Sequence, residues 1–123
     1  MMKESSKWTL HIAAGVVILV LLGLHMLIMH MQTLLVWLGL GTESVLSFEA
    51  VAQRGKQVFF MVTYIVLLGA ALYHGLYGLR NILLELVPGR GAQKGFGVLL
   101  TLVGLGFFAL GTYAAIAAFN MAV

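Results

Sequence analysis

The sequence predicts an all-α integral membrane protein, a single domain of three transmembrane helices spanning residues 1–123. Two observations support this fold class: 62% of the residues are hydrophobic and only 9% are charged, a composition typical of membrane proteins. The charges also leave three apolar stretches, each longer than the roughly 20 residues that a helix needs to cross a bilayer. The charged residues are too few to form a nucleic-acid-binding surface.

The first helix is expected over residues 9–39, because no Asp, Glu, Lys or Arg lies between Lys7 and Glu43. This stretch is longer than a crossing requires, so the helix either tilts or extends past the interface. Trp8 and Trp37 lie near its two ends, where aromatic side chains anchor a helix at the membrane surface. The stretch also exceeds the apolar part of a signal peptide, which favours a retained helix.

The most polar segment, residues 42–56, follows this helix. The spacing of Val45, Phe48 and Val51 places apolar side chains on one side of a helix. We therefore expect a short amphipathic helix within 43–54, lying on the membrane surface.

The second helix is expected over 57–86, with Arg80 and Glu85 near its end, and the third over 95–121. Pro88 and Gly89 end the second helix, because proline cannot continue one and glycine favours a turn. The loop to Gly95 is short and carries Arg90 and Lys94, so the two helices should be adjacent and antiparallel. Four small residues, which suit close helix packing, fall on one face of the third helix: Gly104, Gly111, Ala115 and Ala118.

Basic residues are unevenly distributed between the two ends of the predicted bundle. One end carries Lys3, Lys7, Arg80, Arg90 and Lys94, whereas the other carries only Arg54 and Lys56. Cytoplasmic loops of membrane proteins are enriched in Lys and Arg. We therefore expect a multi-pass protein of the inner (cytoplasmic) membrane, with a cytoplasmic N-terminus and an external C-terminus.

The chain's four histidines, His11, His25, His30 and His74, lie in these apolar stretches. An imidazole inside a membrane is costly unless it has a partner. Neutral histidine is the commonest metal ligand, and two helices can offer one nitrogen to each face of a haem, so a b-type haem is the first hypothesis. The chain has no cysteine, which excludes thiolate ligation and iron–sulfur ligation by this chain.

His74 is the stronger candidate ligand. Gly78 lies one turn further along the same side of the helix, where its small size would let a flat macrocycle approach. Arg80 could reach a haem propionate or a quinone carbonyl with its fixed positive charge. The alternative is a histidine that bonds to a neighbouring backbone carbonyl at a contact between helices.

His25 is the second candidate ligand, because it lies near the middle of the first helix. His11 shares its side of that helix but is about 21 Å away at 1.5 Å per residue, so one haem cannot use both. His11 is either a propionate or quinone contact or an ordinary interfacial residue beside Trp8. His30 lies about 140° around the helix from His25 and is left as a propionate contact or a structural histidine.

Other membrane functions have less support in the sequence. Transporters usually place a carboxylate within the membrane, whereas this chain has no Asp and each Glu lies near a helix end or in a loop. A haem-free helical scaffold or a small transporter subunit remains the alternative hypothesis.

Four motifs give the chain a resemblance to a known family: WTLHIAAG from Trp8 to Gly15, HMLIMH from His25 to His30, FEAVAQR from Phe48 to Arg54, and HGLYGLR from His74 to Arg80. With these motifs the chain resembles the membrane-anchor cytochrome b subunits of succinate dehydrogenase (succinate:quinone oxidoreductase, or complex II). The loop and second-helix motifs are most similar to the smaller hydrophobic anchor of the two-chain complexes.

The resemblance implies three helices packed against a second hydrophobic anchor subunit, with a flavoprotein subunit and an iron–sulfur subunit beside them. It implies two haem b groups, each shared with the partner anchor: His74 matches the proximal ligand and His25 the distal one. A one-haem anchor using only His74 is the alternative within the family. Trp8, His11 and Arg80 are the candidates for a quinone site. Many relatives carry Arg and a polar residue where this chain has Ile12 and Ala14, which weakens the quinone assignment.

Overall fold

The computed structural model describes residues 2–41 and 47–121, and within them the regular secondary structure is entirely helical. Three of the helices are long and apolar enough to cross a membrane, so the all-α membrane fold class is confirmed. The four helices are α1 (Glu4–Trp37), α2 (Phe48–Gly55), α3 (Val58–Leu86) and α4 (Arg90–Asn120).

Helix α1 begins five residues before the expected start. Its polar first turn is helical because Lys7 Nζ pairs with Glu4 Oε1 at 2.7 Å, a spacing that brings two side chains together on a helix. At the other end, Gly39 adopts a left-handed conformation with φ of 74°, and Leu40 N–H donates to the Leu35 carbonyl. This is the glycine-dependent C-terminal cap that ends many helices.

The short helix α2 lies within the polar segment, although residues 43–46 of the expected 43–54 lie outside the described residues. Ser47 begins it, since the Ser47 hydroxyl accepts a hydrogen bond from the Ala50 N–H at 3.2 Å. Its last residue, Gly55, lies against Ala118 of α4, and a Cβ added at Gly55 would be 3.3 Å from the Ala118 Cβ. Helix α2 therefore packs on the end of the bundle that carries the C-terminal end of α4.

The turn between α3 and α4 is shorter than expected, because α4 begins at Arg90. The expectation that Arg90 and Lys94 lie in a loop was wrong: both belong to the first turns of α4. Gly89 makes the tight reversal possible with φ of 106°. Gln93 then donates from Nε2 to the Leu84 and Val87 carbonyls at 3.1 and 3.2 Å, which satisfies acceptors at the end of α3.

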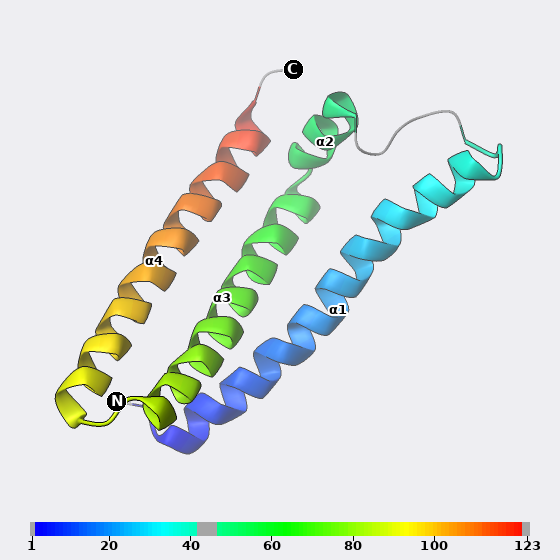
Figure 1. Cartoon of the computed structure of the whole chain (residues 1–123). Helices are drawn as coiled ribbons and strands as arrows, with labels where there is room; N and C mark the ends of the chain where they lie inside the picture. Colours follow the sequence, from blue (N-terminus) through cyan, green and yellow to red (C-terminus); the bar gives the residue numbers. More distant parts are fainter. Residues whose placement is uncertain (1, 42–46, 122–123) are drawn as a thin grey trace.

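Helix α3 lies between α1 and α4, and it runs antiparallel to both (Figure 1). Small residues allow the close approach of α3 and α4, as their sequence predicted. A Cβ added at Gly104 would lie 2.7 Å from Leu76, and one added at Gly69 would lie 3.2 Å from the Phe108 ring. Gly111 lies against Leu68 in the same way.

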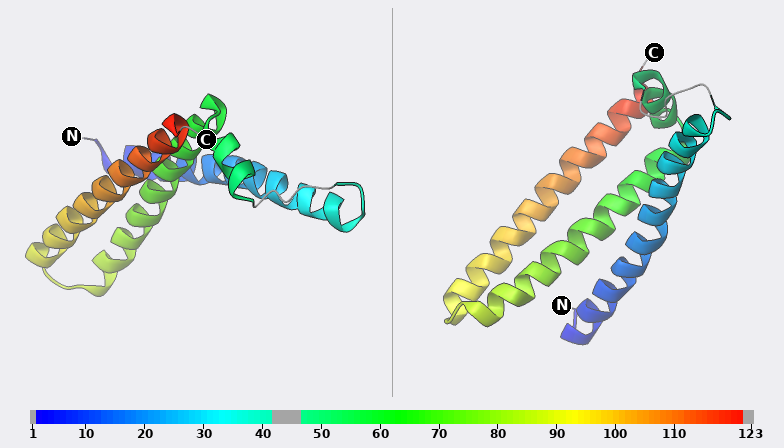
Figure 2. Two further views of the ribbon diagram at one scale, coloured as in Figure 1. Left: turned by 90° about the horizontal axis from the view of Figure 1, so that it is seen from above. Right: turned by 45° about the vertical axis from the view of Figure 1, so that its right-hand side comes forward.

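Helix α1 crosses α3 near the end that holds the α3–α4 turn and then diverges from it (Figure 2). Every residue from 31 to 40 is exposed, and Trp37 is 81% exposed. Among the described residues only Ala14 is buried, at 7% exposure. A chain with so little core of its own needs lipid or other protein chains to cover its apolar sides.

Candidate functional site

His11 of α1 and His74 of α3 form a stacked pair where the two helices cross. Their ring centroids are 4.1 Å apart and the planes differ by only 5°. His74 Nδ1 is 3.0 Å from the carbonyl oxygen of His11. Because a carbonyl only accepts hydrogen bonds, Nδ1 carries a proton, and in the neutral ring Nε2 of His74 keeps its lone pair. The bond to a backbone carbonyl, the alternative to ligation, is therefore present, but it uses one ring nitrogen only.

Two glycines make room for this pair. A Cβ added at Gly15 would lie 3.1 Å from Cε1 of His74, and one added at Gly78 would lie 3.5 Å from Cε1 of His11. The space beside Gly78 that we expected a haem to use thus holds the His11 ring. Haem packing at Gly78 stays a prediction, and it would require His11 to leave this position. Beside Gly75 no atom lies within 4 Å of an added Cβ.

Two tyrosines extend the histidine pair along α3. The rings of Tyr73 and Tyr77 are stacked at 5.7 Å, and the Tyr77 ring lies 5.2 Å from that of His11. Tyr73 also donates its hydroxyl to the Lys7 carbonyl of α1 at 3.1 Å. Neither tyrosine was among the residues predicted from the sequence, although their spacing of four residues places them on one side of α3. We call His11, Tyr73, His74 and Tyr77 the aromatic cluster.

His25 lies at a different depth from the aromatic cluster. Its ring packs edge-on against Tyr64 of α3, with centroids 5.8 Å apart. Tyr64 precedes His74 by ten residues, which is about 15 Å along a helix. In the described part of the chain no three His, Cys, Asp or Glu side chains come together as a metal site.

His30 and Trp8 do not join either histidine site. His30 is exposed, and its Nδ1 lies 2.9 Å from the Met26 carbonyl of its own helix. Trp8 is 60% exposed on α1. The structure thus leaves both residues without a contact to the aromatic cluster, and their predicted roles at a propionate or a quinone stay predictions.

Arg80 lies in a groove between α3 and α4. The cavity there has a volume of about 440 Å³, and its polar lining consists of Tyr73, Tyr77, Arg80 and Thr101. Arg80 follows His74 by six residues, which places the two side chains about 120° apart around the helix. His74 therefore faces α1 whereas Arg80 faces α4.

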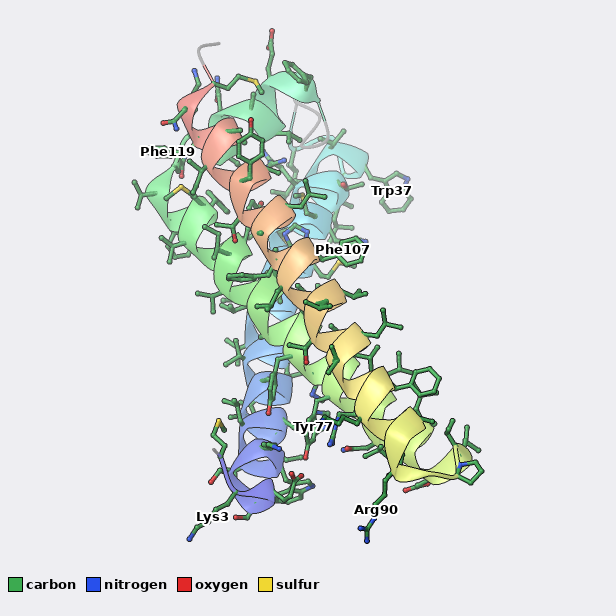
Figure 3. The ribbon with its side chains drawn as sticks, turned by 90° about the vertical axis from the view of Figure 1, so that its left-hand side faces the viewer. Lys3, Trp37, Tyr77, Arg90, Phe107 and Phe119 are labelled. Carbon is green, nitrogen blue, oxygen red and sulfur yellow. The ribbon has the colours of Figure 1, made fainter. Side chains whose placement is uncertain are left out.

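Fold and site together define a multi-pass membrane anchor: three long apolar helices, histidines at two depths, and sides that only lipid or other subunits can cover. The residues at the helix ends agree with this description. The basic residues Lys3 and Arg90 lie at one end of the molecule, and the aromatic residues Trp37 and Phe119 lie toward the other (Figure 3). Both kinds of residue are common at membrane interfaces.

A comparison with curated proteins gives this class a more specific identity. The chain is 29% identical over 110 residues to the succinate dehydrogenase hydrophobic membrane anchor subunit of Archaeoglobus fulgidus, a match that covers 89% of this chain and 86% of that protein. This similarity agrees with the family that the four motifs predicted, the hydrophobic membrane anchor subunits of succinate dehydrogenase. No family model matches the chain, and no solved structure matches it.

Proposed function

We propose that this anchor subunit binds haem b and quinone and carries electrons from an iron–sulfur subunit to quinone. The observation that supports this most directly is the orientation of His74, whose Nδ1–H is bonded to the His11 carbonyl. Histidines that ligate metals usually donate their other ring N–H to such a carbonyl, which fixes the ring and its tautomer. The Nε2 of His74 is then the nitrogen that would bind iron.

The donor chemistry fits a haem shared between two chains. His74 and His25 each present one imidazole, and the other axial ligand of each haem would come from a second hydrophobic anchor subunit. The separation of about 15 Å between their levels on α3 fits two haems better than one. A haem of this kind supplies a one-electron carrier that stays within the membrane. In the described part of the chain the His25 ring makes no hydrogen bond, so its orientation depends on the Tyr64 contact.

The partners in this proposal are the second anchor subunit, an iron–sulfur subunit and a flavoprotein subunit, with quinone as the electron acceptor. Trp8, His11 and Arg80 are this chain's candidates for quinone or propionate contacts, and for Arg80 this assignment competes with the lipid phosphate inferred below. All three lie toward the end that holds the α3–α4 turn. That end also carries most of the basic residues, which favours its placement on the cytoplasmic side.

The test uses the complex that co-purifies with the full chain. We expect a low-spin haem spectrum and two haems per complex. His74→Ala should remove one haem, and His25→Ala should remove the other. His30→Ala should leave both haems in place, because that ring bonds to its own helix; loss of a haem would instead support its predicted propionate contact. One haem that depends on His74 alone would support the one-haem alternative.

A second candidate function is a haem-free helical scaffold or a small transporter subunit. The stacking of His74 on His11 favours the scaffold, because the two rings pack on each other and His74 Nδ1 bonds to a carbonyl of the same chain. A purified complex without a haem absorption band, and with electron transfer to quinone unchanged by His74→Ala, would establish the scaffold and contradict haem binding.

A further inference from the structure

The groove between α3 and α4 changes its polarity along its length. One end is lined by Arg80 of α3 and Gly97 of α4. Tyr77 and Thr101, which carry hydroxyl groups, line the groove about one helical turn further along the same two helices. The other end is formed by apolar residues, among them Gly69, Leu105 and Phe108. The groove therefore has the shape and polarity that suit a molecule with a charged head and a hydrocarbon tail.

Arg80 has a positive charge without a bonded partner. In the described residues its guanidinium makes no hydrogen bond and no salt bridge. Glu4 lies close enough for the two charges to interact, but its carboxylate is bonded to Lys7 at 2.7 Å. A partly buried cation on a membrane-spanning helix is costly unless an anion is close to it.

The depth of the groove matches one leaflet of a bilayer. Helix α3 has 29 residues; at 1.5 Å per residue it is about 43 Å long, whereas the hydrocarbon core is about 30 Å thick. If the helix is centred in the membrane, Arg80 lies about 3 Å inside the hydrocarbon boundary. The long arginine side chain can reach the phosphate layer from there. Gly69, eleven residues away, lies about 16 Å deeper and just beyond the midplane.

We propose that this groove binds an anionic phospholipid, with the phosphate on Arg80 and one acyl chain along the apolar part toward Gly69 and Phe108. A guanidinium pairs well with a phosphate, whereas a quinone has no charge to neutralise it. Free phosphate has no hydrocarbon chain that could pack against the apolar residues of the groove. The site does not depend on haem binding, since Arg80 and His74 face different neighbours of α3.

The proposal can be tested by native mass spectrometry of the intact complex, to which phosphatidylglycerol or phosphatidylcholine of the same chain length is added. We expect the wild-type complex to retain the anionic lipid about tenfold better, since a hydrogen bond to a charged group is worth that factor or more. Arg80→Gln should remove this preference, and Arg80→Lys should keep part of it. Arg90→Gln, which removes an exposed charge from the same end of the molecule, is the matched control and should change nothing.

A second variant tests the apolar part of the groove. Leu105 is 61% exposed and lines it, so Leu105→Trp should fill the groove without disturbing a core and weaken retention of both lipids. Millimolar inorganic phosphate should not displace the lipid. The proposal is overturned if Arg80→Gln retains the preference, if Arg90→Gln loses it, or if a long-chain quinone takes the place of phosphatidylglycerol in the wild type and depends on Arg80.

Discussion

Gly15 is the position at which a single methyl group should disturb the candidate site most selectively. A Cβ added there would lie 3.1 Å from Cε1 and 3.2 Å from Nδ1 of His74. Favourable carbon contacts are about 3.5–4.0 Å, so Gly15→Ala must displace the His74 ring or move α1 by a few tenths of an ångström. Either movement strains the bond between His74 Nδ1 and the His11 carbonyl.

The size of the effect follows from two opposing contributions. Replacing a glycine by alanine inside a helix stabilises the helix by about 0.5–1 kcal/mol. Overpacking a close contact typically costs about 1–3 kcal/mol. Gly23 is the matched control, because it lies in the same helix and a Cβ added there meets no atom within 4 Å. Gly23→Ala should therefore stabilise the protein, and Gly15→Ala should be less stable than Gly23→Ala by about 1–3 kcal/mol.

The assay is the free energy of unfolding of the full chain in mixed micelles, measured for both variants and repeated in a His74→Ala background. Removing the His74 ring removes the contact, so Gly15→Ala and Gly23→Ala should then become equivalent, as a double-mutant cycle requires for a direct interaction. Equal stability of the two variants in the presence of His74 would refute the packing of α1 on α3 described above.

Three further substitutions test other parts of the structure by the same unfolding measurement. Gln93→Ala should destabilise the chain by about 1–3 kcal/mol, because two carbonyls at the end of α3 lose their donor; an unchanged value would mean that this turn does not depend on the glutamine. Tyr73→Phe should cost about 0.5–1.5 kcal/mol through the lost bond to the α1 backbone. His30→Phe should change stability by less than about 0.5 kcal/mol, because the residue is exposed and bonds only to its own helix; a larger loss would show that His30 has a partner within the chain.

Much of the fold could be predicted from the sequence because charges and apolar stretches determine which residues can enter a membrane. The second helix, expected over 57–86, differs from α3 by one residue at its start. Helix starts were less predictable. Both α1 and α4 begin five residues before their expected positions, because charged residues were taken to lie outside the helices. A helix can extend past the hydrocarbon layer into water, and only contacts such as Lys7 with Glu4 determine where it begins.

The candidate site was less predictable than the fold, since it depends on which sides of the helices meet. The sequence identified His74 and both of its possible environments, a metal and a backbone carbonyl. It gave no means of predicting that His11 would stack on His74, because that contact requires the crossing of α1 over α3 near Gly15 and Gly78. The role of Tyr73 and Tyr77 was missed for the same reason.

The arrangement of α3 would allow one helix to hold both proposed ligands, a haem and a lipid. Its side toward α1 carries His74, whose bond to a backbone carbonyl fixes the orientation that a haem ligand needs. Its side toward α4 carries Arg80 in a groove lined by residues of both helices. Residues 31–40 of α1 are exposed beyond His25, whose ring contacts Tyr64 of α3, so the proposed distal haem site would have to be completed by another subunit. His25→Ala should therefore affect assembly with the second anchor chain more than the stability of this chain alone, which co-purification measured beside unfolding can separate. Loss of stability without loss of the partner would contradict a shared distal site.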